Sequence, residues 1–123
     1  MDNGKPCIFL VDDGIINLNA GKNALQHKYM VITIPSGEKL MFALKKIRPE
    51  LILLDVEMPG MSGYEAIKAL KSNPEYAAIP VIFITGKAKA EDESYAISLG
   101  AADFIAKPFS QAGLLAKIEE HIR

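Results

Sequence analysis

The feature that most constrains the fold is a series of five short apolar runs spread along the whole chain. They span residues 7–11, 29–34, 51–54, 81–85 and 104–106. Each run is continuous rather than alternating, which is typical of strands covered on both faces and therefore of a parallel sheet. Helical spacing occurs between the runs, in the series Leu40, Ala43, Leu44, Ile47 and Leu114, Ile118, Ile122. We therefore predict an α/β domain.

The residues between the runs mark where helices begin and end. The candidate helix caps are Ser36, Ser110 and the capping-box pair Ser62 and Glu65. The candidate stop signals are Asn73-Pro74 and Leu99-Gly100. Strands that alternate with helices in this way predict a doubly wound (βα)5 sandwich with right-handed crossovers, and a five-stranded parallel sheet in the order 2-1-3-4-5.

Composition argues against several classes of protein. The chain has 123 residues and is 50% hydrophobic, which suits one domain with its own core. Lys and Arg number 14 against 15 Asp and Glu, and they are scattered, so we expect no direct contact with nucleic acid. The single Cys7 lies in an apolar run, as in proteins of reducing compartments. No signal peptide or run of ~20 apolar residues is evident, so we predict a cytoplasmic location without membrane contact.

Polar residues gather where the apolar runs end. Asp12 and Asp13 follow the first run, Asp55 follows the third, Thr85 ends the fourth and Lys107 follows the fifth. Asp is seldom buried unless it is paired or binds a metal, so Asp55 either caps the loop that follows or belongs to a site. In an open parallel sheet, ligands bind at the carboxyl ends of the strands, where strand order reverses. We therefore expect the three aspartates to share one crevice.

Three carboxylates in one crevice repel one another and need positive charge. A pair about 4 Å apart costs about 4 kcal/mol at an effective dielectric of about 20. Lys107 supplies one positive charge, and Mg²⁺ (or Mn²⁺) would supply the remainder, because hard cations prefer oxygen ligands. Asp55 beside such a cation is suited to attack phosphorus, while Thr85 is suited to hydrogen-bond a phosphoryl oxygen. The residues therefore indicate phosphoryl chemistry.

Four stretches carry a resemblance to a known family. They are 10-LVDDG-14, 53-LLDVEMPGMSG-63, 81-VIFITG-86 and 100-GAADFIAKPF-109. In this order and at these separations, they resemble the response-regulator receiver domain of two-component signalling. The resemblance implies a flavodoxin-like fold and a single receiver domain over residues 1–123.

The resemblance also implies a role for each matching acidic residue. Asp55 matches the aspartate that receives a phosphoryl group from a sensor histidine kinase or a phosphotransfer protein. Asp12 and Asp13 match the acidic pair that holds Mg²⁺, together with Asp55 and the main-chain carbonyl of Glu57. The metal set implied by the resemblance is therefore Asp12, Asp13, Asp55 and Glu57.

Further matches lie on the last two strands. Thr85 and Lys107 match the pair that contacts the phosphoryl group, and the Lys107–Pro108 peptide bond is expected to be cis. Phe104 stands at the aromatic switch position, where Tyr is commoner, so it lacks a hydroxyl group and is either a switch residue or a plain core residue. Gly14 stands where a third acidic residue often follows the pair.

Two charged residues flank the expected phosphate site. Glu57 comes two residues after Asp55, and Lys87 comes two residues after Thr85. We hypothesise that Glu57 and Lys87 pair across the site and hinder attack by water. Self-dephosphorylation would then be slow.

The leading interpretation is a phosphoacceptor switch that modifies itself and is not an enzyme for external substrates. Phosphorylation would add negative charge and remodel the neighbouring surface through a population shift. We expect a partner, an output domain or a second copy of the chain to dock on that surface, which comprises residues 87–99, 104–106 and 110–122.

Two alternatives belong to other classes of protein. An aspartyl-nucleophile phosphohydrolase is suggested by 55-DVE-57, although the chain leaves no room for a cap domain and Glu57 replaces the second Asp of such enzymes. A docking module that works without phosphorylation is the other alternative. The intact set of site residues argues against it.

Overall fold

The computed structural model describes residues 4–86 and 90–122, and within them five parallel strands form one sheet. The strands are β1 (Cys7–Val11), β2 (Met30–Ile34), β3 (Leu51–Asp55), β4 (Val81–Thr85) and β5 (Asp103–Ala106). Their order across the sheet is β2-β1-β3-β4-β5, with every neighbouring pair parallel. This confirms the predicted order, and the strand bounds differ from the predicted runs by at most one residue.

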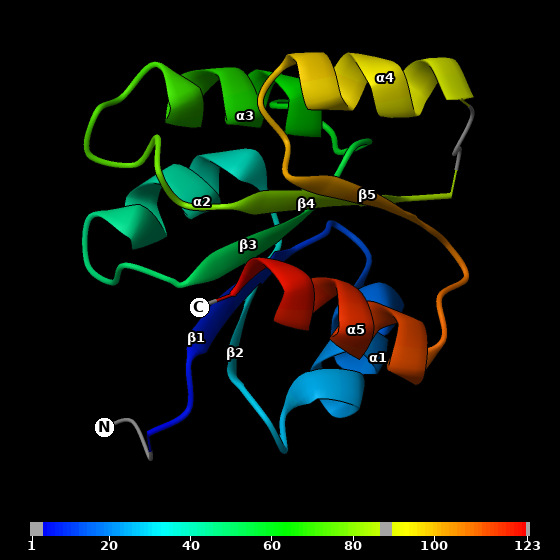
Figure 1. The fold of residues 1–123 in the computed structure, drawn as a ribbon. Helices are drawn as coiled ribbons and strands as arrows, with labels where there is room; N and C mark the ends of the chain where they lie inside the picture. Colours follow the sequence, from blue (N-terminus) through cyan, green and yellow to red (C-terminus); the bar gives the residue numbers. More distant parts are fainter. Residues whose placement is uncertain (1–3, 87–89, 123) are drawn as a thin grey trace.

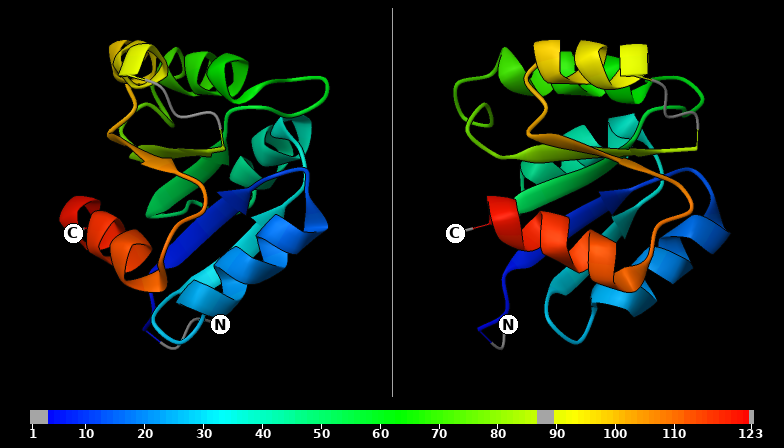
Figure 2. Two further views of the ribbon diagram at one scale, coloured as in Figure 1. Left: turned by 90° about the vertical axis from the view of Figure 1, so that its right-hand side faces the viewer. Right: turned by 45° about the vertical axis from the view of Figure 1, so that its right-hand side comes forward.

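Helices cover both faces of the sheet. They are α1 (Ile15–Leu25), α2 (Gly37–Leu44), α3 (Gly63–Lys71), α4 (Ala90–Ser98) and α5 (Gln111–His121). Figures 1 and 2 show α2, α3 and α4 on one face and α1 with α5 on the other. The doubly wound (βα)5 sandwich is therefore confirmed. Within the described residues, no helix is long and apolar enough to cross a membrane.

The continuous apolar runs feed two separate cores, because successive side chains of a strand point to opposite faces. In β3, Ile52 and Leu54 pack toward α2, α3 and α4, whereas Leu51 and Leu53 pack toward α1 and α5. The run at residues 30–33 is the exception, because β2 is an edge strand and these side chains are only half-buried or exposed. Coverage on both faces therefore holds for the central strands.

The predicted helix starts are confirmed by their hydrogen bonds. The Ser36 hydroxyl accepts from the Lys39 amide, and the Ser110 hydroxyl accepts from the Gly113 amide. Ser62 and Glu65 form a complete capping box at the start of α3. The N-terminus of α3 is therefore fixed by side-chain hydrogen bonds.

The predicted helical position of Ile47 is wrong. Helix α2 ends at Leu44, where the Lys45 amide donates to the Phe42 carbonyl and tightens the last turn. Ile47 is 40% exposed instead of lying on the buried face. The residue before a proline avoids helical backbone, so Pro49 forces the chain out of the helix before β3 begins.

Helix α3 starts directly against the end of β3, and Gly63 makes this approach possible. Its amide donates to the Val56 carbonyl at 2.8 Å. A Cβ atom at this position would overlap the carbonyl oxygen of Asp55 and lie 2.9 Å from Cα of Val56. The lack of a side chain at Gly63 therefore allows the loop after Asp55 to close tightly behind the site.

Substitution of Gly63 tests this close approach. We expect Gly63→Ala to lower the free energy of unfolding by about 1–3 kcal/mol, because the new methyl group meets backbone that cannot move aside. Gly86→Ala is the matched control, since no described atom lies within 4 Å of a Cβ placed there. Urea denaturation of both variants measures the difference. Equal stability of the two variants would show that the loop has room for a side chain at Gly63.

Candidate functional site

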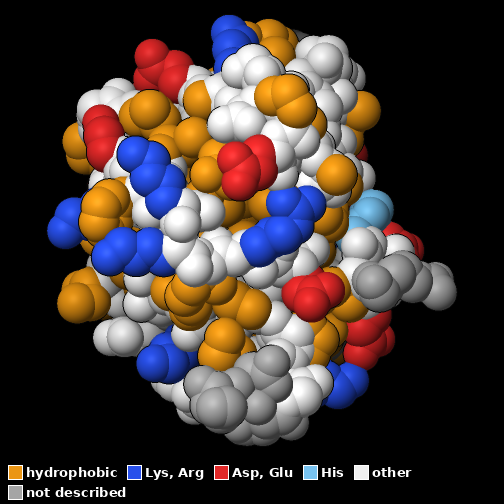
Figure 3. All heavy atoms as spheres, turned by 90° about the vertical axis from the view of Figure 1, so that its left-hand side faces the viewer, with side chains coloured by type: hydrophobic (Ala, Val, Ile, Leu, Met, Phe, Trp, Pro, Cys, Tyr) orange, Lys and Arg blue, Asp and Glu red, His pale blue; other side chains and the backbone are white. Residues whose placement is uncertain are grey.

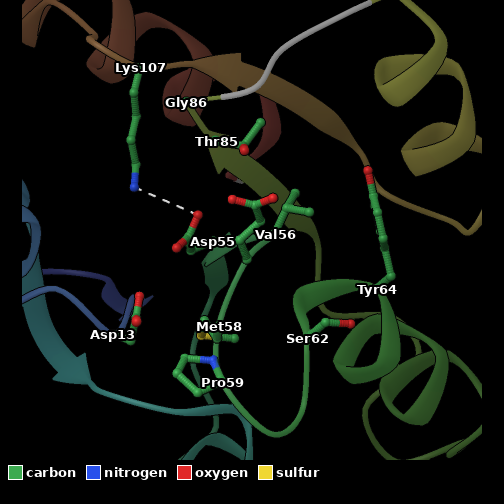
Figure 4. Close-up of a pocket in the computed structure, with 11 residues that line it drawn as sticks. Asp13, Asp55, Val56, Met58, Pro59, Ser62, Tyr64, Thr85, Gly86 and Lys107 are labelled. Carbon is green, nitrogen blue, oxygen red and sulfur yellow. Dashed lines mark ion pairs between the residues drawn. The ribbon is translucent and has the colours of Figure 1, made fainter.

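The polar residues predicted to share a crevice do meet at the carboxyl ends of the strands. A cleft of about 950 Å³ opens there, and Asp13, Asp55, Glu57, Thr85 and Lys107 all line it. Figure 4 shows Asp55 between Asp13 and Lys107, with Thr85 beside it at the end of β4. Figure 3 shows the opposite end of the molecule, where charged side chains of both signs lie among hydrophobic ones.

The three aspartates form a compact set of oxygen ligands. One carboxylate oxygen from each of Asp12, Asp13 and Asp55 lies within 4.8 Å of the others. Asp12 and Asp55 are buried, whereas Asp13 is exposed at the mouth of the cleft. Hard divalent cations bind oxygen ligands of this kind and keep several waters. The set therefore fits the predicted Mg²⁺ site.

Asp12 is held in place from several sides. Its Oδ1 accepts from the Gly14 amide at 2.8 Å and from the Asn17 side chain at 3.4 Å. Its Oδ2 accepts from Lys107 Nζ at 2.7 Å. The carboxylate is therefore oriented by the start of α1 and by the end of β5.

Lys107 neutralises the two buried aspartates unequally. Its Nζ lies 2.7 Å from Asp12 Oδ2 but 3.6 Å from Asp55 Oδ1. The Lys107 amide donates to the Thr85 carbonyl, and the Lys107–Pro108 peptide bond is cis, as predicted. Lys107 is therefore fixed beside the cleft, with its closer ion pair to Asp12.

The environment of Asp55 disfavours its charged form. Burial, followed by the negative charge of Asp12, raises the pKa of Asp55 to about 6. Lys107 and a hydrogen bond from the main-chain amide of Glu57 act in the opposite direction. The carboxylate at neutral pH is therefore short of positive charge, which is the condition in which a cation binds favourably.

This pKa shift makes the stability of the metal-free protein depend on pH. The pKa of Asp55 is higher in the folded chain than the reference value of 3.8, so the folded state retains a proton that the unfolded state releases. The contribution of Asp55 to stability is therefore present at about pH 4 and is lost as pH rises through about 6.

Replacement of Asp55 by a neutral isostere tests this sign. With a chelator present, we expect Asp55→Asn to be more stable than the wild type by about 1–2 kcal/mol at about pH 7.5, after allowance for solvent screening. The gain should shrink at about pH 4.5, where the wild-type carboxyl is already neutral. Urea denaturation at both pH values measures it. An equal gain at both values would contradict a raised pKa.

Thr85 is buried, with 3% of its surface exposed, and it ends β4 at the wall of the cleft. Glu57 is exposed, and its main-chain amide donates a hydrogen bond to the Asp55 carboxylate. Lys87, its hypothesised partner, lies outside the described residues. The roles of Thr85 and of the Glu57 carbonyl therefore stay predictions.

Phe104 is 8% exposed and belongs to the core cluster that includes Phe83 and Ala96. In this conformation it packs as a core residue. Its predicted role as a switch stays a prediction.

Two features of the structure were missed by sequence reasoning. Tyr64, in the first turn of α3, lines the cleft, although nothing in its sequence neighbourhood indicates this.

His121, to which the sequence assigned no role, lies 3.0 Å from Asp103, which also accepts from Lys117. Burial alone would raise the pKa of Asp103, but these bonds and one from the Phe104 amide lower it. We interpret this second cluster as a set of polar contacts that fixes the end of α5.

Comparison with known proteins identifies the family. A family model described as response regulator receiver domain matches residues 8–119. The chain belongs to the response-regulator receiver family. A probable cyclic di-GMP phosphodiesterase of Vibrio cholerae is 39% identical over 116 residues, which cover 94% of this chain and 26% of that protein. The receiver domain spans 26% to 48% of the length of the first three curated relatives.

Solved structures agree with this assignment. The chemotaxis protein CheY4 of Vibrio cholerae superposes with a TM-score of 0.91 at 28% identity, covering 97% of this chain and 100% of that one. The receiver domain of sensor histidine kinase PA1611 from Pseudomonas aeruginosa superposes with a TM-score of 0.88 at 25% identity, covering 96% and 98% of the two chains. That structure holds a magnesium ion in its active-site cleft. The receiver domain described here is thus a phosphoacceptor switch of two-component signalling.

Proposed function

We propose that Asp55 is the residue that accepts the phosphoryl group. The observation that supports this most directly is its charge balance, because Asp55 is buried in the cleft while the nearest cation pairs more closely with Asp12. The Asp12 carboxylate, by contrast, already accepts hydrogen bonds from Gly14, Asn17 and Lys107. A carboxylate oxygen of Asp55 would bond to phosphorus as the phosphorus–nitrogen bond of a phosphohistidine donor breaks, and the imidazole would leave with the electron pair.

We assign the binding of the divalent cation to Asp12, Asp13, Asp55 and the main-chain carbonyl of Glu57. Bound Mg²⁺ neutralises phosphoryl oxygens, and Mn²⁺ offers the same charge. Lys107 supplies a second positive charge from the end of β5, and Thr85 supplies a hydroxyl donor from the end of β4. Thr85 ends β4, and Lys107 directly follows the neighbouring strand β5. The Lys107 amide donates to the Thr85 carbonyl at 2.8 Å.

Labelling by a small phosphodonor tests the acceptor. With Mg²⁺ and acetyl phosphate, intact mass spectrometry should show one added phosphoryl group on the wild type and none on Asp55→Asn. Asp103→Asn is the matched control, because Asp103 is another strand carboxylate, partly buried, that belongs to the cluster with His121. Labelling that persists in Asp55→Asn would place the acceptor elsewhere. Repeated turnover of p-nitrophenyl phosphate would instead support the phosphohydrolase alternative.

Metal affinity tests the ligand set. We expect Asp13→Asn to weaken Mg²⁺ binding about tenfold, because it removes one charge from a set of three carboxylates that share the cleft. Isothermal titration calorimetry measures the change. Asp103→Asn again serves as the control, since Asp103, Glu120 and His121 form the second possible cluster of ligands. An unchanged affinity in Asp13→Asn would remove Asp13 from the site.

The phosphoryl donor is a histidine kinase or a phosphotransfer protein, as the receiver family implies. We propose that the response is presented on the surface made by α4, β5 and α5, where an output domain, a protein partner or a second copy would dock. Of the predicted surface residues 87–99, those at 87–89 lie outside the described residues. Tyr95 and Ile97 of α4 are 43% and 46% exposed, so this surface offers apolar contact area.

We further infer a cytoplasmic location and slow self-dephosphorylation. The location is supported by Cys7, a buried free thiol of the kind kept in reducing compartments. Slow hydrolysis is supported by Glu57, whose exposed side chain borders the cleft where attacking water would enter. No external substrate is proposed.

A further inference from the structure

Tyr64 bridges the phosphoacceptor cleft and helix α4. Its ring meets the Phe83 ring of β4 edge-on, with centroids 5.4 Å apart and planes at 75°. It also meets the Tyr95 ring of α4, with centroids 4.9 Å apart and planes at 79°. Figure 4 shows Tyr64 on the side of the cleft away from Lys107, and Figure 2 shows α3 and α4 next to each other. Three elements therefore meet through one side chain.

The strand beneath Tyr64 is the one that carries Thr85. Phe83 and Thr85 are two residues apart on β4, so they point to the same face of the sheet. Tyr64 and Thr85 also line a small cavity of about 130 Å³ together with Asp92 of α4. A movement of the Thr85 end of β4 therefore changes the shape of the cavity beside Tyr64.

The electrostatic surroundings of Tyr64 agree with this position. Burial, followed by the charge of Asp92, raises the pKa of the Tyr64 phenol, with smaller contributions from Tyr95 and Glu57. The Tyr64 ring therefore lies close to Asp92 of α4 and to Glu57 of the loop after Asp55.

We propose that the Tyr64–Tyr95 contact transmits phosphorylation of Asp55 to α4. This inference rests on the proposed function of Asp55 as acceptor. New negative charge in the cleft draws the Thr85 hydroxyl toward it and alters the cavity beside Tyr64. Tyr64 then changes its packing on Tyr95, which is 43% exposed, so the apolar surface of α4 differs between the two states. Tyr64 is a positioning residue in this scheme.

The residue at position 104 gives a reason why the signal would pass through Tyr64 and Tyr95. Phe104, at the position of the family's aromatic switch, is already buried and has no hydroxyl group to couple to Thr85. Tyr64 and Tyr95 provide an aromatic connection on the same face of the sheet as Phe83 and Thr85. This connection depends on edge-on ring contacts, which are directional and are lost when either ring is removed.

Four single variants separate this contact from general effects on α4. Tyr64→Leu removes the ring but keeps an apolar side chain, and Tyr64→Phe restores the ring without the hydroxyl. Tyr95→Ala removes the other ring from the surface. Ile97→Ala is the matched control, because Ile97 is 46% exposed on the same helix, close to the 43% of Tyr95. Tyr95→Ala keeps the test valid should Tyr64→Leu fold poorly.

The measurement is the shift of backbone amide resonances when Mg²⁺ and beryllofluoride, a phosphoryl mimic, are added. The amides of Val56 and Gly86 report the site, and those of residues 96–99 report α4. In Tyr64→Leu and Tyr95→Ala, the site amides should respond as in the wild type. The ratio of the α4 equilibrium constants with and without the mimic should fall about fivefold, the factor that corresponds to one aromatic pair. Tyr64→Phe and Ile97→Ala should respond like the wild type.

Intact mass after treatment with acetyl phosphate keeps the two proposals distinguishable. A wild type that takes up no phosphoryl group overturns the proposed function, and this inference falls with it. Variants that are labelled and keep the full α4 response overturn only the role of the aromatic contact. A loss of response in Ile97→Ala equal to that in Tyr95→Ala would also overturn it, since any truncation of α4 would then suffice.

Discussion

The interaction on which the rest of the structure depends is the shared use of Lys107 by two buried carboxylates. Asp12 and Asp55 are 4% and 7% exposed, and Lys107 lies at 2.7 Å from one and 3.6 Å from the other. A buried charge without full compensation is costly, and here it raises the pKa of Asp55 to about 6. The apo site is therefore held in a state that any added positive charge stabilises. In the function proposed above, binding of a cation and transfer of a phosphoryl group to Asp55 would both act on this imbalance.

The fold places Asp12 and Asp55 at the carboxyl ends of two adjacent central strands. β1 and β3 are central strands, and the reversal of strand order between them opens the crevice at their carboxyl ends. The side chains of these strands fill both cores, so the site stands on a rigid support. Gly63 lets α3 start against the end of β3, which brings the first turn of α3 to the wall of the cleft. A close backbone approach thus links β3 to the helix that carries Tyr64.

Most of the fold and the site residues were predictable because their signals are local or topological. Continuous apolar runs indicated buried parallel strands. Asp55, Thr85 and Lys107, at the ends of these runs, had to meet because parallel strands share an edge. What could not be predicted depends on packing between distant residues. Ile47 fits a helical repeat, but Pro49 ends the helix first. Tyr64 looks like any residue in a first helical turn until Phe83 and Tyr95 are brought beside it. The closer pairing of Lys107 with Asp12 than with Asp55 depends on distances of 2.7 Å and 3.6 Å, which spacing along the chain does not specify.

Helix α4 buries few of its described side chains in the core, which favours its movement when the site changes. Among the side chains of α4 that the structure describes, Ala96 is the buried one, whereas α3 buries Ala66, Ile67 and Leu70. A helix with so little buried apolar area is only weakly stabilised by the core, and elements of low local stability are those that move in response to ligands. The contact of Tyr95 with Tyr64 adds to the packing of Ala96 on the core in positioning α4. Because Tyr64 borders the cleft, the contact that helps to hold the helix also lies next to the site.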